Sequence, residues 1–367
     1  MSNGELCLVT GATGFLAGHV VADLLRHGYR VRGTVRDLGN TAKSAHLTSM
    51  KGAGENLELV QADLLDDDAS WQKVVTGCTY VFHMASPFIV GISDDEAEEK
   101  LFKPAREGTL SVLRAAHAAG GVSRVVLTSS MAAINSGHDP VAFLKEPEKQ
   151  WTNLEKADNY SKSKTMAERA AWDFVKECKA KGEPVFELST INPTLVIGPT
   201  LSSSFATSHE FPYRLLARKM PAVPDMKIGT VDVRDVAAAH RLAATVPEAA
   251  GERFALWAQE TSIQHWSRVL AKEFAPLGYK VPTTRAPYPL LWLLSWFDQA
   301  IAVILPRVGK SKSEVDNSKV QRVLGLTFTE EEKSMIDAGY ACIEHRLKGI
   351  EQTKEYKDYL AAKTAEE

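Results

Sequence analysis

GATGFLAG, residues 11–18, lies between the apolar run ELCLVT and the amphipathic stretch HVVADLLRHG. A strand, a glycine-rich turn and a helix are therefore predicted in that order. Gly11 can adopt the tight turn, Gly14 lets the backbone approach a pyrophosphate, and Ala17 or Gly18 lets the helix pack close to the strand. We therefore expect a phosphate-binding turn at a helix N-terminus.

Apolar runs alternate with helical patterns through the first two hundred residues. Strands that alternate with helices form βαβ units and a parallel sheet. The predicted fold class is α/β, a doubly wound, Rossmann-like parallel sheet with a smaller C-terminal substrate lobe. The strands are predicted at residues 6–10, 29–35, 57–63, 80–85, 124–129 and 187–191.

The regular alternation fades after INPTLVIGP, residues 191–199. We expect a nucleotide-binding Rossmann domain over residues 1–197, to which a segment near 227–250 returns with the strand-like KIGTVDVRD. The substrate-binding lobe is predicted to comprise residues 198–226 and 251–367.

Composition limits the classes of partner. The 367 residues are 44% hydrophobic and 24% charged, and the formal net charge is −3. Such a chain offers no basic field for nucleic acid and no polybasic anchor for an integral membrane role. We expect a small-molecule partner and a monomer or homodimer.

The cysteines indicate neither a disulfide framework nor a metal site. Cys7, Cys78, Cys178 and Cys342 are far apart and form no CxxC motif. The N-terminal residues also lack the features of a signal peptide. Both observations favour a cytoplasmic location.

One apolar segment, PLLWLLSWFDQAIAVILP at residues 289–306, raises the question of a membrane. Asp298 and Gln299 interrupt it, and the uninterrupted part is well short of the roughly 20 residues that a spanning helix needs. We expect a helix and turn that line an apolar pocket, with membrane-surface contact as the alternative.

TGATGFLAGHVV resembles the opening of the extended short-chain dehydrogenase/reductases, whose fingerprint is TGxxGxxG. Ala17 at the third small position resembles the branch that contains cinnamoyl-CoA reductases and yeast methylglyoxal (aldehyde) reductases, close to plant dihydroflavonol reductases. The resemblance covers most of the chain and is weakest beyond residue 200. It implies an oxidoreductase that acts on CH–OH or carbonyl groups with a nicotinamide cofactor.

The second strand is followed by Arg36, where an acidic residue would hold the 2′-hydroxyl of NAD. A guanidinium can bind a 2′-phosphate bidentately, and Lys43 adds a second cation where the resembling reductases carry one. NADP(H) is therefore the predicted cofactor. Asp37 weakens this inference, and two solvated surface cations are the simpler alternative.

The resemblance implies further cofactor contacts. Asp63 matches the adenine-side residue, VFHMAS (81–86) matches the strand over the cofactor, and Pro193 begins the segment beside the nicotinamide. The complete predicted set comprises Gly11, Thr13, Gly14, Phe15, Leu16, Arg36, Lys43, Asp63, Leu64, Met84, Ala85, Ser86, Tyr160, Lys164, Pro193, Thr194 and Val196.

Carbonyl reduction needs a proton donor, and a tyrosine can serve if a nearby cation lowers its pKa from about 10. Tyr160 and Lys164 in NYSKSKTMAE are four residues apart, hence on one helix face. Spacing alone is weak support, because Tyr359 and Lys363 repeat it in a polar tail that we interpret as surface.

The setting of the first pair, after RVVLTSSMAAIN (124–135), resembles the family's catalytic serine segment. It implies that Ser130 orients the substrate carbonyl while Ser129 is structural. Tyr160 would donate the proton, and Lys164 would lower its pKa and hold the nicotinamide ribose. The alternative for both serines is a polar strand end.

Substrate contacts are the weakest predictions. Asn135 matches a substrate-contacting asparagine in dihydroflavonol reductases, although a loop cap explains it nearly as well. For the others, ordinary core packing is the simpler explanation. These pocket candidates are Ser86, Phe88, Phe205 and Tyr213.

Together these features predict an NADPH-dependent carbonyl reductase that transfers hydride to an aldehyde or ketone. A 3β-hydroxysteroid dehydrogenase or a sugar-nucleotide epimerase shares the glycines and the Tyr-x-x-x-Lys pair. A non-catalytic NADP-sensing regulator is the third alternative, although such proteins typically lose the tyrosine that this chain keeps.

Overall fold

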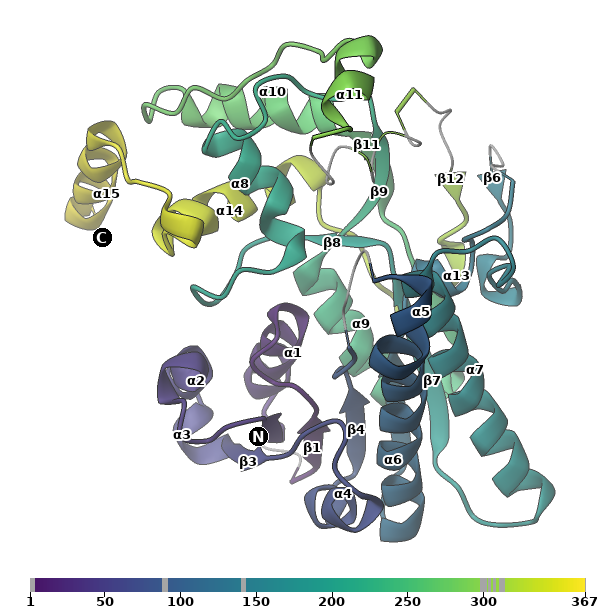
Figure 1. Ribbon diagram of the computed structural model, residues 1–367. Coiled ribbons are helices and arrows are strands. Elements are labelled where there is room, and N and C mark those ends of the chain that lie inside the picture. The colour runs from purple at the N-terminus through teal and green to yellow at the C-terminus, as the bar shows by residue number, and fades with distance from the viewer. Residues whose placement is uncertain are drawn as a thin grey trace.

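A seven-stranded parallel sheet forms the centre of the molecule in the computed structural model (Figure 1). The structure describes residues 4–87, 92–139, 143–297, 302, 305, 308–309 and 314–366. The strand order β10-β7-β5-β4-β1-β2-β3 reverses direction at β1, which confirms the predicted doubly wound α/β class. The strands are β1 (Leu6–Val9), β2 (Arg30–Val35), β3 (Leu57–Gln61), β4 (Tyr80–His83), β5 (Arg124–Thr128), β7 (Glu187–Pro193) and β10 (Arg253–Leu256).

Helices cover both faces of this sheet, because its strands are apolar on both sides. Along β1, Leu6 and Leu8 face one core while Cys7 and Val9 face the other. The first core lies under α4 (Asp68–Val75), α6 (Lys103–Ala119) and α7 (Asn159–Ala180). The second lies under α1 (Phe15–Arg26), α9 (Val233–Thr245) and α13 (Ser318–Leu324). The same unit contains three short helices: α2 (Thr41–Thr48), α3 (Ala53–Asn56) and α5 (Asp94–Ala97).

A smaller unit lies at the carboxyl ends of the central strands, in the upper half of Figure 1. It contains a three-stranded sheet in the order β11-β9-β8 and its own apolar core. Its strands and helices are β8 (Leu195–Ile197), β9 (Lys227–Asp232), β11 (Gln259–Ser262), α8 (Glu210–Leu216), α10 (Ile263–Phe274), α11 (Tyr288–Leu294), α14 (Glu331–Glu344) and α15 (Lys354–Glu366). A further two-stranded pair joins β6 (Phe143–Leu144) to β12 (Glu314–Val315).

A strand forms near the predicted residues 227–235, but it does not return to the central sheet as expected. β9 pairs with β8 and β11 rather than with the central sheet. Only α9, which follows it, packs against α1, and β10 then pairs with β7. The strand that completes the central sheet therefore lies at 253–256, inside the range predicted for the lobe, because α9 must first cross the sheet face. The predicted domain boundaries stay a prediction.

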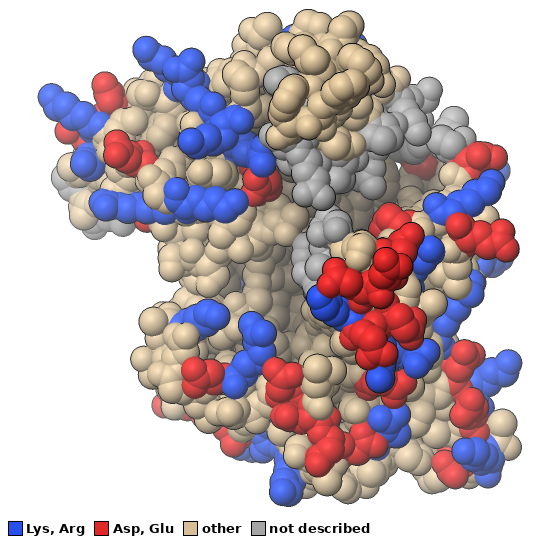
Figure 2. Space-filling view, in the orientation of Figure 1, with Lys and Arg blue, Asp and Glu red and all other residues tan. Residues whose placement is uncertain are grey.

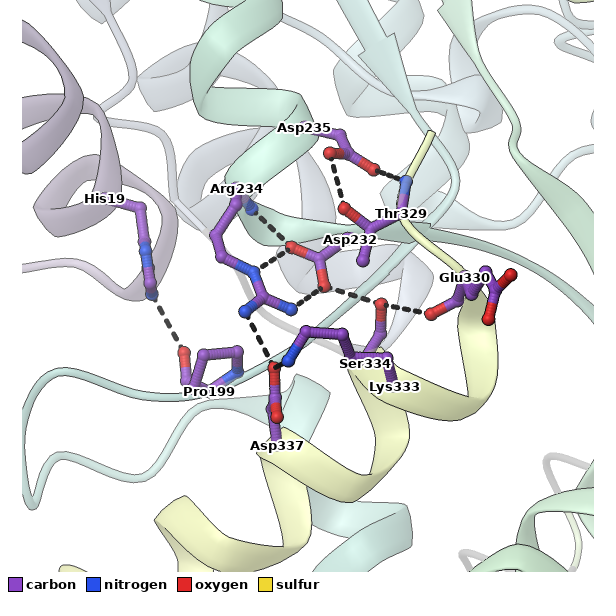
Figure 3. Close-up of polar contacts among 10 residues, drawn as sticks. All are labelled: His19, Pro199, Asp232, Arg234, Asp235, Thr329, Glu330, Lys333, Ser334 and Asp337. Carbon is purple, nitrogen blue, oxygen red and sulfur yellow. Dashed lines mark hydrogen bonds and ion pairs between the residues drawn. The ribbon is translucent and has the colours of Figure 1, made fainter. Parts of the chain in front are cut away.

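A buried ionic network joins the start of α9 to α14 (Figure 3). Arg234 forms an ion pair with the buried Asp232 at 2.7 Å and with Asp337 of α14 at 2.7 Å. Ser334 donates a hydrogen bond to Asp232 at 2.5 Å. Because these contacts pair a buried carboxylate with a cation and a hydroxyl, they fix α14 against the second sheet.

The apolar segment 289–306 is only partly described. A helix does form, as α11, but the large side chains from Tyr288 to Phe297 are mostly exposed, and Leu291 is the buried exception. The predicted lining of an apolar pocket is therefore wrong for residues 289–297. Within the described residues, no helix is both long and apolar enough to cross a membrane.

Gly229 in β9 tests the packing of the second sheet. A Cβ atom at this position would lie 2.3 Å from the ring of Trp257. Gly229→Ala should therefore lower the free energy of unfolding by about 1–3 kcal/mol, as measured by denaturant titration. Gly54→Ala is the control, since a Cβ there meets nothing within 4 Å, and it should leave stability unchanged or slightly higher.

Candidate active site

The glycine-rich turn is fixed to two neighbouring strands. Gly11 has a φ of +66°, which favours glycine, and its N–H donates to the Thr34 hydroxyl at 2.9 Å. The Thr10 hydroxyl accepts from the backbone N–H groups of Met84 and Ala85, both at 2.9 Å. The turn and the end of β4 are thus held side by side at the carboxyl edge of the sheet, where ligands bind in this class of fold.

The turn fits a dinucleotide pyrophosphate. Gly14 is the exposed N-cap of α1, and a Cβ atom on it would lie 3.2 Å from the carbonyl oxygen of Gly11. The N–H groups of Phe15 and Leu16 in the first turn have no backbone acceptor in the described part of the chain. Thr13 lies half-buried between the glycines. Free N–H donors at a helix N-terminus are suited to an anion.

The two cations predicted to bind a 2′-phosphate lie on the surface of the nucleotide-binding half. Arg36 and Lys43 are exposed, and neither side chain forms an ion pair within the described residues. Asp37 forms no ion pair with Arg36 within the described residues, and its carboxylate accepts from the Gly39 N–H at 2.8 Å. Asp63 likewise accepts from the backbone, from the N–H of Leu65 at 3.0 Å.

Leu64 and Ser86 occupy less exposed positions around the same edge. Leu64 packs against α6 at Gly108, where a Cβ atom would lie 2.4 Å from it. Ser86 lines a small cavity together with Ala85, Ser129 and Lys164. The strand-end residues predicted over the cofactor therefore lie beside the predicted catalytic lysine.

Helix α7 positions the tyrosine and the lysine. Its N-cap, Asp158, accepts from the N–H of Ser161 at 2.9 Å and fixes the first turn. Tyr160 lies in that turn, and Lys164 and Glu168 follow at intervals of four residues on the same helix face. Lys164 and Glu168 are buried.

The serine reaches the same place from the end of β5. An interaction with the Ser130 side chain opposes the rise in the pKa of Tyr160, so these two side chains lie close together. Ser130 also accepts from the Ala132 N–H at 3.1 Å, and its hydroxyl lies 3.5 Å from the carbonyl oxygen of Pro193. The structure therefore brings Ser130, Tyr160 and Pro193 together. Thr194 lies in the connection to the second sheet, and its hydroxyl donates to the carbonyl oxygen of Gly229. Val196 lies in β8 itself.

The electrostatics differ from the expectation in one respect. Burial raises the pKa of Tyr160 above its usual value, the bond with Ser130 opposes this rise, and Asp158 adds to it. The predicted lowering of this pKa is therefore not seen, because burial disfavours a phenolate. Burial lowers the pKa of Lys164 to about 8, against the opposing effect of Glu168. Burial, with Lys164 nearby, also lowers the pKa of His83 to about 3.

Glu168 is the centre of a buried polar network that the sequence interpretation missed. Ser129 and Asn192 donate to one carboxylate oxygen, at 2.5 and 2.7 Å. Thr190 and Arg253 donate to the other, at 3.1 and 2.6 Å. The carboxylate thus ties α7 to the residue that follows β5, to β7 and to the first residue of β10.

Arg253 is the cation that balances this carboxylate. It is 8% exposed, and its guanidinium also donates to the carbonyl oxygens of Glu148 and Gln150, each at 2.7 Å. The Cζ atom of Arg253 lies 3.9 Å from the centre of the Trp151 ring. The only sequence sign of this arrangement was an acidic residue, Glu168, on the buried face of a helix.

Of the residues predicted to contact substrate, only some lie close to one another. Phe205 and Tyr213 contact each other, with ring centres 5.6 Å apart, and Phe205 lies near His209, whose ring packs on Phe15 of the glycine turn. These aromatic residues thus connect the lobe to the nucleotide-binding turn. Phe88 lies outside the described residues.

Asn135 is half-buried just after the catalytic serine segment, and its N–H donates to the carbonyl oxygen of Met131 at 3.0 Å. A hollow of about 570 Å³ lies on the outer lobe, and Tyr160 is not among the residues that line it. Tyr213 lines this hollow together with basic side chains, and it also contacts Phe205.

The four cysteines are free and buried. Cys178 has two potential metal ligands nearby, because its Sγ atom, a ring nitrogen of His117 and a carboxylate oxygen of Glu183 all lie within 4.8 Å of one another. Burial and Glu183 raise the pKa of the Cys178 thiol, however, so the thiolate that metal coordination needs is disfavoured.

Comparison with known proteins places this geometry in a family. The profile described as "NAD dependent epimerase/dehydratase family" matches residues 7–256, which include the glycine turn, the serine segment and the tyrosine–lysine pair. The chain belongs to this family. Its relatives are oxidoreductases, so the predicted enzyme class and the resemblance to the extended short-chain dehydrogenase/reductases are confirmed.

Relatives and solved structures cover nearly the whole chain. Cinnamoyl-CoA reductase CAD2 of Medicago truncatula is 38% identical over 274 residues, 73% of this chain and 79% of the relative. Tetraketide alpha-pyrone reductase 1 of Arabidopsis thaliana is 34% identical over 351 residues, 92% and 97% of the two chains. The NADPH complex of yeast methylglyoxal/isovaleraldehyde reductase Gre2 has a TM-score of 0.74 at 27% identity, covering 94% of this chain and 100% of Gre2.

The Glu168 network can be tested by removing its charge. Glu168→Gln keeps the side-chain volume but leaves Arg253 buried without a counter-ion. The free energy of unfolding should fall by about 3–5 kcal/mol, measured by denaturant titration. Glu177→Gln, on the exposed face of the same helix, should change it by less than about 0.5 kcal/mol. Equal effects of the two variants would contradict the role given to Glu168.

Proposed function

We propose that the chain is an NADPH-dependent reductase of aldehydes or ketones, with Ser130, Tyr160 and Lys164 as its catalytic residues. The observation that carries the proposal is that Ser130, just after β5, and Tyr160, in the first turn of α7, come together, with Lys164 one turn further along α7. This trio lies at the carboxyl edge of the sheet, next to the Pro193 segment. A regulator that only binds the cofactor would not need this arrangement.

The direction of each pKa shift supports the proposed roles. When bound, the cofactor supplies the hydride. A raised pKa keeps the Tyr160 phenol protonated at neutral pH, and a protonated phenol is the form that can donate to the developing alkoxide. Ser130, close to that phenol, would donate to the same carbonyl oxygen. Lys164, with a pKa of about 8, is still mainly charged at pH 7.

Preference for NADPH is supported by the two exposed cations, Arg36 and Lys43, and by the NADPH complexes among the similar structures. An exposed guanidinium without a carboxylate partner can bind a 2′-phosphate at little cost. Apolar carbonyl compounds are the proposed substrates. The predicted cytoplasmic location and the monomeric or homodimeric state stay predictions.

The catalytic assignment is tested with Tyr160→Phe, which removes one hydroxyl. Turnover of NADPH with a panel of aldehydes and ketones should fall by about 10²–10⁴-fold, because general acid catalysis is lost. NADPH binding, measured by fluorescence titration, should change little. Tyr359→Phe is the matched control in the second Tyr-x-x-x-Lys pair and should keep full turnover. Turnover of a nucleotide sugar alone would instead favour the epimerase alternative.

The cofactor assignment is tested with Arg36→Glu. The unmodified protein should bind NADPH more tightly than NADH, and the variant should lose most of this preference because a carboxylate repels the 2′-phosphate. Dissociation constants of both cofactors, measured by calorimetry, decide the matter. Arg30→Glu, an exposed change at the start of β2, should leave the ratio as it was. Equal affinities in the unmodified protein would contradict the assignment.

A further inference from the structure

The hollow of about 570 Å³ on the outer lobe, which we name the basic hollow, has no part in the proposed chemistry. Three segments meet around it: the end of α8, the turn that follows α10 and the turn that follows α14. Leu216, Tyr279 and Ile350 are buried members of its lining and give it an apolar floor. Its volume lies within the range of clefts that hold small molecules, roughly 300–1,000 Å³.

The charged side chains around the basic hollow are mostly positive. Four cations, Arg218, Lys219, Lys280 and Lys348, line it, together with one carboxylate, Glu351. All five residues are exposed. In Figure 2 Lys and Arg side chains gather at the upper left, where Figure 1 shows α8 and α14, whereas Asp and Glu gather at the centre right. Since the whole chain has a net charge of −3, this excess of positive charge is local.

Most of these cations are available to a ligand. Arg218, Lys219 and Lys280 form no ion pair and no side-chain hydrogen bond within the residues that the structure describes. Lys348 is different, because its ammonium pairs with Glu210 at 3.0 Å and lies 3.7 Å from the centre of the Phe205 ring. The basic hollow therefore has one cation that its neighbours hold in place and three whose charge is not neutralised by a described carboxylate.

The backbone at two of the cations is also unusual. Arg218 has a φ of +55° and Lys348 a φ of +46°, in the left-handed region that favours glycine. Residues held in this conformation are typical of segments that clamp a ligand. Large cationic side chains thus occupy positions where the backbone alone would favour a smaller residue.

We propose that the basic hollow binds a small molecule that carries a pyrophosphate or a longer phosphate chain, at a site separate from the glycine-rich turn. Three unneutralised cations call for more than one negative charge, and a guanidinium binds phosphate oxygens bidentately. The apolar floor would contact the rest of the ligand. A concave site of this size suits a small molecule better than a flat membrane surface, and the negative net charge of the chain disfavours nucleic acid.

The test is titration calorimetry of the purified full-length chain with inorganic tripolyphosphate, after addition of one equivalent of NADPH to occupy the glycine-rich turn. Lys219→Gln with Lys280→Gln should weaken tripolyphosphate binding by about tenfold or more, because two charge-assisted contacts are lost. Glu351→Gln should instead strengthen it by about threefold, because the carboxylate repels the phosphate chain. The two variants therefore shift the dissociation constant in opposite directions.

Lys227→Gln with Lys272→Gln is the matched control. It removes the same charge from two exposed lysines of the same lobe that do not line the hollow, so tripolyphosphate should bind as it does to the unmodified chain. Thermal melting and the NADPH dissociation constant should be unchanged in all three variants. Failure of NADPH to bind would count against the proposed function alone, because the variants still report on the hollow.

Two results would overturn the proposal of a phosphate site in the basic hollow. One is absence of tripolyphosphate binding to the unmodified chain up to about 5 mM. The other is equal weakening by the two double-lysine variants, which would mean that tripolyphosphate responds to the overall charge of the lobe and not to this site.

Discussion

The ion pair between Glu168 and Arg253 is the constraint on which the catalytic edge of the sheet depends. Two fully formed charges inside a protein are costly, and the cost is offset only if their remaining donors and acceptors are also satisfied. Here the carboxylate accepts from Ser129, just after β5, and from Thr190 on β7. The guanidinium donates to two carbonyl oxygens in the loop before α7 through Nη1, whereas its buried Nη2 has no hydrogen-bond partner within the described residues, so the cost is only partly offset. Ser129, the neighbour of Ser130, is one of those donors. This buried network therefore helps to set the position of Ser130, the proposed catalytic serine.

Glu168 also acts on the site through charge. It lies one helical turn beyond Lys164, and its negative charge opposes the loss of the lysine proton that burial favours. Without this carboxylate, desolvation alone would shift the balance further toward the neutral amine. One buried residue thus serves the geometry of the serine and the charge of the lysine. The second network, around Asp232 and Arg234, uses the same physics to fix α14 to the lobe.

Features with a local cause could be predicted from the sequence. The strands were visible because buried parallel strands are short continuous apolar runs. The turn at Gly11 was visible because its positive φ restricts the residue type. The partners of Glu168 could not be foreseen, since Asn192 and Arg253 are far from it in sequence and meet only in the folded sheet. The pKa of Tyr160 was expected to fall because its spacing from Lys164 is visible in the sequence. The burial that raises this pKa depends on the folded structure and could not be foreseen.

The second unit was the least predictable, because its local patterns allow more than one environment. A run such as PLLWLLSWF is equally apolar whether it lines a pocket or faces outward. What separates the two outcomes is the attachment through Val223, which turns one side chain inward, Leu291, and leaves its neighbours exposed. Such a surface lies outside the network that holds Ser130 and Tyr160 in place. Substitutions on the exposed face of α11 should therefore leave Ser130 and Tyr160 undisturbed, whereas a change at Glu168 should affect both the fold and the proposed chemistry.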